Sequence, residues 1–540
     1  MRGKLRLLTA LLLVLALLAG CSCEKSLGEK VAELQAQRGQ KDDGPRITNE
    51  DLVYTRPDAE ELERLLTAAC DLSETGTAEE ILDAVWEYYD AYDWFYTYYA
   101  LADIRYSADL TDPYWEEEYD FCAEMATDVD GGLERLNRTL AKSPLRDELE
   151  QKFFGEGFFE DYDGESLWDE DFSRLLEEET RLQNLFYELS AEENGEPGTA
   201  SWYDACADDR AQVLVDLIRV RQQMADHWGY DSYAGFAWDF YYYRDYTPDQ
   251  AIGYYDGIRQ ELVPLYRESV NSDAWDEVYR SASEDATFSY VRSAAKAMGG
   301  TPWEAFCLLE EGRLYDIAPG ANKYTSSFEI YLTSYGVPFV FMCPDGTRYD
   351  YLTFAHEFGH FCSDFAAGGS YAGVDVSEVF SQGMEYLTLC YGGSEELTRA
   401  KLADSLATYV EQAAFGSFEQ RMYDLEGEEL SVEGLYALYE EVALEFGFDA
   451  VGYDRREFVE INHYYTNPMY IVSYVVSNDA AMQLYQRELE EQGAGVALLE
   501  KNLATEDGYF LAFVENAGLE SPFAAGRLES VRKLFAEVGV

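Results

Sequence analysis

The sequence predicts a mostly α-helical protein with one small β-sheet. Along most of its 540 residues, apolar side chains recur three and four positions apart, the spacing of one helix face, as in AEELERLLTAACDL. One stretch, SSFEIYLTSYGVPFVFMCPDGT, is instead rich in β-branched and aromatic residues and contains the turn-forming pairs Tyr335-Gly336 and Asp345-Gly346. Because the chain is longer than one hydrophobic core usually organises, we expect more than one lobe.

The N-terminus has the features of an export signal followed by a tether. Residues 1–20 combine a basic start, an apolar run from Leu11 to Leu18 and small residues before Cys21. The run is shorter than the roughly 20 apolar residues that cross a membrane, which argues against a transmembrane helix. The stretch LAGC resembles a bacterial lipobox, and the resemblance implies acylation of Cys21 and anchoring of the exported protein to the membrane at the bacterial cell surface. Residues 21–46 are polar and suit a tether.

Two helical regions follow this tether. Residues 47–195 contain long amphipathic patterns and are predicted to form an N-terminal helical lobe. Turn-forming residues gather in ENGEPGTAS, which marks a boundary. Residues 201–540 then form a second domain, which starts with the helical pattern DDRAQVLVDLIRVRQQMADHWGY, includes the small sheet and returns to helices up to Val540.

The composition excludes two classes of protein. An apolar fraction of 47% with 15% aromatic residues supplies enough burial to argue against disorder. The net charge of −65 repels phosphate backbones, so we expect no nucleic-acid partner. The same acidity is a common solubility device and does not identify a cationic substrate.

The stretch TFAHEFGHF holds two of the chain's four histidines. Residues four apart lie on one helix face, so His356 and His360 can direct their imidazoles at one metal ion. Glu357 would lie beside the metal, where it can take a proton from water. The alternative is a helix with two surface histidines. The flanking residues are apolar, however, and burying these groups without a partner would be costly.

A catalytic zinc site needs a third protein ligand, and VDVSEVFSQGMEYLTL offers two candidates. Glu378 and Glu385 are two helical turns apart and share one face. One carboxylate can bind zinc while the other accepts a hydrogen bond from a histidine ligand, which fixes the tautomer of that histidine. A solvated helix face is the alternative for either glutamate alone.

These motifs resemble the zinc oligopeptidases that include oligoendopeptidase F and thimet oligopeptidase. Counting from His360 as in that family places the ligand at Glu385 and makes Glu378 its outer partner. The resemblance implies one Zn²⁺ ion held by His356, His360 and Glu385. It also implies a zincin-type helical fold, with the small sheet beside the HExxH helix and a deep channel between helical lobes that admits short peptides.

A third segment, INHYYTNPMYIVSYVVS, agrees with this resemblance. Asn467-Pro468 suggests an N-cap and first helical residue, so that Tyr470 and Tyr474 would share a face of the following helix. In the oligoendopeptidase F group a similar stretch supplies a histidine and tyrosines that face the substrate. The resemblance therefore implies that one of His463, Tyr470 and Tyr474 donates a hydrogen bond to the oxyanion, and the sequence leaves open which of the two tyrosines does so.

Four other features receive their own interpretation. Tyr464 and Tyr465 are reserve donors, with core packing as the alternative. His227 matches no catalytic role and is interpreted as structural. Gly359, inside a helix, indicates close packing at that turn. The strand around residues 338–342 is expected to pair with an extended substrate.

The sequence thus predicts a zinc-dependent endopeptidase that hydrolyses short peptides. Zinc would lower the pKa of a water molecule, and Glu357 would take its proton and return it to the leaving amine. One alternative is a surface lipoprotein that binds peptides without hydrolysis, although binding alone needs no general base such as Glu357. Another is a zinc protease of a different clan that acts on proteins.

Overall fold

The computed structural model describes residues 47–163, 169–192, 198–369, 372–505 and 508–538. The predicted signal segment, the tether and Cys21 lie outside these residues. Among the helices in these ranges, none combines the length and apolar character of a membrane span.

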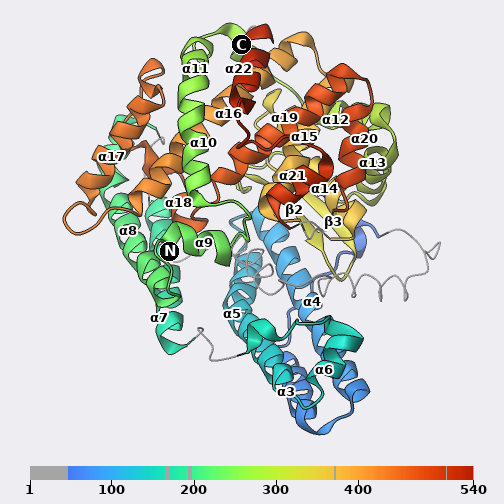
Figure 1. The fold of residues 1–540 in the computed structure, drawn as a ribbon. Coiled ribbons are helices and arrows are strands. Elements are labelled where there is room, and N and C mark those ends of the chain that lie inside the picture. Colours follow the sequence, from blue (N-terminus) through green and yellow to red (C-terminus); the bar gives the residue numbers. More distant parts are fainter. Residues whose placement is uncertain (1–46, 164–168, 193–197, 370–371, 506–507, 539–540) are drawn as a thin grey trace. The chain divides into compact units, whose positions relative to one another are not determined.

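The prediction of a mostly α-helical fold is confirmed (Figure 1). Several helices begin at side-chain caps that satisfy their free N–H groups, as Asp58 does for α3 and Thr77 with Glu80 for α4. The α-helices are α3 (Ala59–Thr75), α4 (Ala78–Ala108), α5 (Pro113–Ala141), α6 (Arg146–Leu149), α7 (Glu170–Glu192), α8 (Ala200–His227), α9 (Tyr233–Phe240), α10 (Pro248–Glu261), α11 (Val263–Ser269), α12 (Glu284–Met298), α13 (Gly300–Gly312), α14 (Tyr349–Ala367), α15 (Val374–Gly392), α16 (Glu395–Met422), α17 (Val432–Glu445), α18 (His463–Thr466), α19 (Val472–Glu490), α20 (Ala494–Asn502), α21 (Phe510–Ala517) and α22 (Arg527–Val538). Short helical turns are η1 (Asn49–Asp51), η2 (Glu150–Phe154), η3 (Glu160–Tyr162), η4 (Asp273–Glu277), η5 (Phe448–Ala450) and η6 (Glu457–Glu460).

The predicted small sheet is also confirmed. It contains β1 (Tyr315–Asp316), β2 (Ser327–Leu332) and β3 (Val337–Met342) in the order β1-β3-β2. β2 and β3 form an antiparallel hairpin, joined at the predicted Tyr335-Gly336 turn, and β1 pairs with β3 in parallel. β1 has only two residues, too few for a period-2 pattern, so the sequence did not reveal it.

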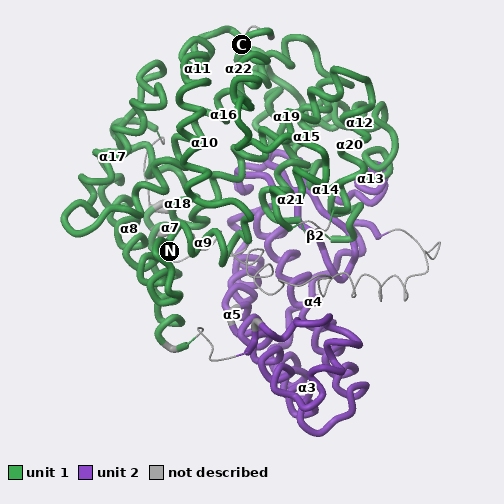
Figure 2. The backbone as a smooth tube through the Cα atoms, in the orientation of Figure 1, with its two compact units in different colours: residues 1–8, 167–306, 344–540 green, residues 9–166, 307–343 purple. Residues whose placement is uncertain are grey.

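The chain divides into two compact units (Figure 2). The described part of unit 2 covers residues 47–163 and 307–343, and that of unit 1 covers residues 169–192, 198–306, 344–369, 372–505 and 508–538. These units differ from the predicted lobes 47–195 and 201–540, because the sheet groups with the N-terminal helices and α7 groups with the C-terminal ones.

Packing within each unit explains both differences. In unit 2, the backbone N–H of Ser334 donates to Thr97 Oγ1 on α4 over 3.0 Å, which ties the hairpin to that helix. In unit 1, Arg221 Nε on α8 donates to Glu179 Oε1 on α7 over 2.6 Å, in a fully buried position. The turn-forming stretch after α7 therefore interrupts the helices without separating two units.

Three helices of unit 1 form the framework of the site described below. α15 packs against both α14 and α19. At Gly359 of α14 the approach is so close that a Cβ atom would lie 2.5 Å from the carbonyl oxygen of Phe380 on α15. This confirms the close packing predicted for Gly359. Between α15 and α19, Gln382 donates to Ser477 Oγ over 3.0 Å, which links these two helices.

Candidate metal centre

The two histidines of the HEFGH motif lie together on α14. Asp350 fixes the start of this helix, because its carboxylate accepts the backbone N–H groups of Asp345, Gly346 and Thr347 at 2.9 to 3.2 Å. Four residues apart, His356 and His360 place their ring centroids 5.1 Å from each other, as the spacing predicts. The segment is largely buried, which is also as predicted.

Glu378 on α15 completes a group of potential metal ligands with these histidines. One ligand atom from each of His356, His360 and Glu378 lies within 4.8 Å of the others. His356 Nε2 is 3.4 Å from Glu378 Oε2. His360 Nδ1 lies 3.0 Å from Ser377 Oγ, which leaves its Nε2 for a metal. Two imidazoles and one carboxylate are a donor set that zinc accepts, with one position left open.

Glu385 occupies the outer position, so the geometry reverses the roles that the family count implies for the two glutamates. Its Oε1 accepts a hydrogen bond from His356 Nδ1 over 2.9 Å, and its Oε2 is 2.7 Å from Lys401 Nζ. Counting residues assumes a loop of fixed length between α14 and α15. Which carboxylate meets the histidines depends instead on where α15 crosses α14 at Gly359.

Burial and charge shift the proton affinities of this cluster. Burial acts to lower the pKa of His356, but its hydrogen bond to Glu385 and the neighbouring carboxylates raise it to about 9. Burial and the charge of His356 hold the pKa of His360 well below its usual range. Burial, with the charges of Glu378 and Glu385, raises the pKa of Glu357 to about 7.

The charge of the cluster suits a divalent cation. Three buried carboxylates, those of Glu357, Glu378 and Glu385, gather around the imidazoles. Burial acts to raise the pKa of Glu385, but the charge of Lys401 and the bond from His356 lower it, so this carboxylate remains ionised. Without a metal, Lys401 and a protonated His356 compensate these acidic groups in a region of low dielectric, and a bound cation would take over the role of the proton on His356.

The structure also brings His463, Tyr470 and Tyr474 together, as the resemblance implied. Their ring centroids lie 5.2 to 5.7 Å apart, and Tyr474 Oη is 3.4 Å from His463 Nε2. Tyr470 donates from its hydroxyl to Glu378 Oε1 over 2.9 Å, which joins this group to the ligand set. Burial lowers the pKa of His463 to about 4, so its ring is neutral at pH 7.

The predicted start of the helix in this segment is wrong. Asn467 and Pro468 follow the short helix α18, and α19 begins only at Val472. Met469 has a positive φ of 67°, which breaks the helical path. Tyr470 therefore lies in the turn before α19. This turn brings it close to Tyr474, whereas the prediction places both residues on one face of the same helix.

The remaining histidine and the reserve tyrosines have structural contacts. His227 Nε2 lies 3.5 Å from Asp169, and its ring stacks on Phe172. Tyr464 donates to the carbonyl of Phe415, and the ring of Tyr465 stacks in the core. These contacts agree with a structural role for His227 and with core packing for the two tyrosines.

Sequence reasoning missed the polar residues that support this site. Ser377 and Lys401 contact His360 and Glu385 directly, and Arg244 and Glu419 contact the turn that carries Tyr470. Ser377 could have been noticed from its place beside Glu378. The other three lie on distant segments, and no local pattern marks them.

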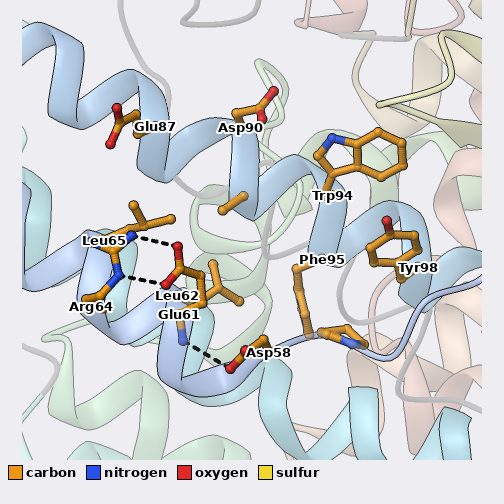
Figure 3. A pocket seen from close by; sticks show the side chains of 12 residues that line it. Asp58, Glu61, Leu62, Arg64, Leu65, Glu87, Asp90, Trp94, Phe95 and Tyr98 are labelled. Atoms are coloured by element: carbon orange, nitrogen blue, oxygen red, sulfur yellow. Dashed lines mark hydrogen bonds and ion pairs between the residues drawn. The ribbon is translucent and has the colours of Figure 1, made fainter.

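A separate pocket lies between α3 and α4 in unit 2 (Figure 3). Its volume is about 440 Å³, and its wall combines acidic side chains such as Glu87 and Asp90 with the aromatic Trp94 and Tyr98. Arg64, the basic residue of this wall, is held by Glu61. None of the metal-centre residues lines this pocket.

The fold is shared with solved peptidase structures. A protein assigned as oligoendopeptidase F matches with a TM-score of 0.77 at 20% identity, over 91% of this chain and 98% of that one. PZ peptidase A with an inhibitor matches with a TM-score of 0.75 at 20% identity, over 90% and 99%. Oligoendopeptidase F from Enterococcus faecium matches with a TM-score of 0.53 at 15% identity, over 89% and 96%.

A comparison with protein-family models finds one match, in the N-terminal part of the chain. Residues 50–165 match the model of the peptidase M3 N-terminal domain. This part of the chain is therefore similar to the N-terminal domain of M3 peptidases, and the fold as a whole is similar to that of the oligoendopeptidase F structures. No curated protein matched the sequence. The M3 match covers residues of unit 2, whereas the residues of the metal centre belong to unit 1.

Proposed function

We propose that this M3-type chain is a zinc-dependent endopeptidase that hydrolyses short peptides. One observation carries the proposal: His356, His360 and Glu378 converge within 4.8 Å, and Glu357 is the next residue on the same helix. The M3 match supports a peptidase, and the geometry of these four side chains supports metal-assisted hydrolysis.

The donor set fits zinc, with His356, His360 and Glu378 as its holders. Each imidazole has a polar partner at Nδ1, Glu385 for His356 and Ser377 for His360, so each ring is oriented with Nε2 available. Zinc bound there would supply a Lewis acid that acidifies water and polarises a peptide carbonyl.

Glu357 is the proposed general base. It is buried at 7% exposure on α14, one residue after a proposed ligand, and no side chain of the described residues forms a hydrogen bond with it. A carboxylate in such a position can accept a proton from the attacking water and return it to the leaving amine. The aspartates and glutamates already engaged, such as Glu385 with Lys401, are less suited to this exchange.

Tyr474 and His463 are the first proposed donors to the oxyanion, and Tyr470, whose single hydroxyl proton goes to Glu378 in this structure, would donate to it only by turning away from Glu378. Tyr470 reaches Glu378 directly, and Tyr474 pairs with the neutral imidazole of His463. Burial and the charge of Glu378 raise the pKa of both tyrosines well above the usual range, so both hydroxyls keep their protons. Protonated hydroxyls held in a buried site are suitable donors to a developing negative charge.

Short peptides are the proposed substrates because the matched structures are named as oligoendopeptidase F and PZ peptidase A. The test combines zinc content with cleavage of a mixed peptide library and of casein. We expect about one zinc per chain and cleavage of peptides but not of casein. Cleavage of casein would favour a protease of broader range. Zinc binding with no cleavage of any peptide would favour peptide binding without hydrolysis.

Glu357→Gln tests the mechanism itself. It leaves all three proposed ligands in place, so zinc content should stay normal while turnover falls by roughly 10²–10⁴-fold. Near-normal turnover in a zinc-loaded variant would contradict the role of Glu357.

We also propose that the protein is exported and lipid-anchored through Cys21, on the strength of the LAGC stretch and the apolar segment before it. In cells fed a labelled fatty acid, the parent protein should carry label and fractionate with membranes. Cys21→Ser should lose both properties. An unlabelled parent protein in the soluble fraction would contradict the anchor.

A further inference from the structure

The backbone beside Tyr470 adopts an unusual conformation. Among the described residues, the non-glycine positions with positive φ are Tyr243, Arg313 and Met469. Met469 is almost completely buried, and its φ of 67° lies in a region that side chains other than Gly, Asn and Asp rarely adopt. Such a conformation persists only where the surroundings determine it, and it often occurs at functional sites.

Three buried side chains hold this turn. Tyr242 donates from its hydroxyl to the carbonyl of Pro468 over 2.7 Å. Arg244 Nη1 donates to the carbonyl of Met469 over 2.8 Å, and the N–H of Met469 donates to Glu419 Oε1 over 2.7 Å. Both polar groups of the Met469 backbone are thus fixed by the side chains of Arg244 and Glu419, which come from other segments.

Arg244 also holds the helix that carries Glu378. Its Nε lies 3.2 Å from Asp375 Oδ2 at the start of α15, and its Nη2 donates to Ser473 Oγ over 2.8 Å. Asp375 also accepts from the hydroxyls of Tyr246 and Ser473. One guanidinium therefore connects the first turn of α15 to the segment of Tyr470.

The result of these contacts is the hydrogen bond from Tyr470 to Glu378 Oε1. Glu378 lies one turn after Asp375 on α15, and Tyr470 directly follows Met469. A buried ion pair such as Arg244–Asp375 is a poor device for stability alone, because desolvation offsets its attraction. The arrangement is better explained as one that fixes geometry.

We propose that Arg244 and Glu419 are positioning residues, which clamp the backbone of Met469 so that Tyr470 holds the Glu378 carboxylate in place for the metal. The inference rests on the proposed function in that Glu378 is taken as a zinc ligand. Neither residue touches the substrate or the metal in this scheme, and both act through Tyr470.

A double-mutant cycle between Glu419 and Tyr470 tests this. Glu419→Met removes the acceptor for the Met469 N–H, whereas Glu419→Gln keeps an oxygen at that place. The zinc dissociation constant, measured by chelator competition, and the kcat for a peptide are compared in the parent and in Tyr470→Phe. We expect Glu419→Met and Tyr470→Phe each to weaken zinc binding by about 10-fold, in the range of outer partners.

The double variant should bind zinc no more than about 2-fold more weakly than either single one, and Glu419→Gln should stay near the parent. The inference would be overturned if the losses of zinc affinity in the two single variants multiplied in the double variant. It would also be overturned by a folded Glu419→Gln that binds zinc as weakly as Glu419→Met. If Glu419→Met does not fold, Tyr242→Phe takes its place, because it removes only the hydrogen bond to the Pro468 carbonyl in the same turn. Tyr242→Phe should weaken zinc binding in the parent but not in Tyr470→Phe.

The two proposals fail in different ways. A parent protein that binds zinc but cleaves no peptide would overturn the proposed hydrolysis, while the zinc-affinity cycle would still decide the positioning role. Conversely, an active parent protein with multiplicative losses would overturn the positioning role alone.

Discussion

On one side of the proposed metal centre, His356, His360 and Glu378 project from two regular helices, α14 and α15. On the other side, Tyr470 projects from a turn held by Arg244 and Glu419, which come from distant parts of the chain. The helical side is positioned by helix period and by one close backbone approach at Gly359. The tyrosine side depends on buried polar contacts. Substitutions on the first side should therefore appear in metal affinity and packing. Those on the second should appear in turnover and, through the bond from Tyr470 to Glu378, in a smaller loss of metal affinity.

The largest effect should come from the helical side, in the pair Glu378→Ala and Glu385→Ala. Glu378→Ala should lower the zinc affinity by well over 100-fold, because it removes a proposed direct ligand. Glu385→Ala should lower the zinc affinity by roughly 10- to 100-fold, as is typical of an outer partner. Chelator competition measures both. The opposite order would restore Glu385 as the ligand and would mean that the position of α15 differs from that described.

On the tyrosine side, Tyr474→Phe and His463→Phe should each lower turnover by roughly 10²–10³-fold with normal zinc content. Tyr470→Phe should show a similar loss of turnover together with weaker zinc binding, because its hydroxyl also reaches Glu378. Tyr485→Phe, farther along α19, is a matched control and should behave like the parent. Turnover within a few-fold of the parent in all three variants would reduce this segment to core packing.

The close approach of α14 and α15 can be tested at Gly359. Because an added Cβ would meet backbone atoms at 2.5 Å, Gly359→Ala should lower the thermal midpoint, with a cost of about 1–3 kcal/mol. Gly253→Ala in α10 is the control, since its Cβ would enter open space and alanine favours the helix. Equal midpoints for the two variants would show that the crossing of α14 and α15 is looser than described.

The smallest effect, taken per pH unit, should be a pH dependence of the folding stability at Glu419. Burial raises the pKa of this carboxyl to about 8, although the Met469 N–H and the charges of Arg221 and Arg244 act to lower it. Between the ordinary pKa of about 4.5 and the folded pKa, the unfolded chain loses this proton first. Stability should therefore fall as pH rises, by at most about 1.4 kcal/mol per pH unit.

Thermal unfolding of the metal-free protein from pH 5 to 8 measures this slope. Glu419→Gln should become more stable relative to the parent as pH rises, whereas Glu426→Gln, at an exposed position, should keep a constant difference. A constant difference for Glu419→Gln as well would show that Glu419 titrates normally in the folded protein.

The sequence allowed most of the helical side to be predicted. Apolar periodicity predicted the long helices, and the spacing of His356 and His360 predicted their convergence, because both depend on neighbours a few residues away. It predicted that Glu378 and Glu385 share a face, but not which of them forms a ligand group with both histidines. That choice depends on how two helices cross, and a single periodicity carries no such information.

The tyrosine side was predicted less well for the same reason. Pro468 favours the first turn of a helix, yet long-range bonds from Arg244 and Glu419 hold Met469 in a non-helical conformation. Such contacts override a local preference of about one kcal/mol without leaving a trace in the neighbouring sequence. The grouping of the β2–β3 hairpin with α4 was hidden in the same way.

The contact at Gly359 bears on how related chains can differ in length between the two helices. The crossing of the two backbones at Gly359 sets the distance between Glu378 and the histidines. The length of the connection after Gly368 therefore need not be fixed. Insertions or deletions in that connection would then leave the three ligand atoms where they are. Ligands in other sequences of this type are better sought by aligning the helix that meets the glycine of HExGH than by counting residues from the second histidine.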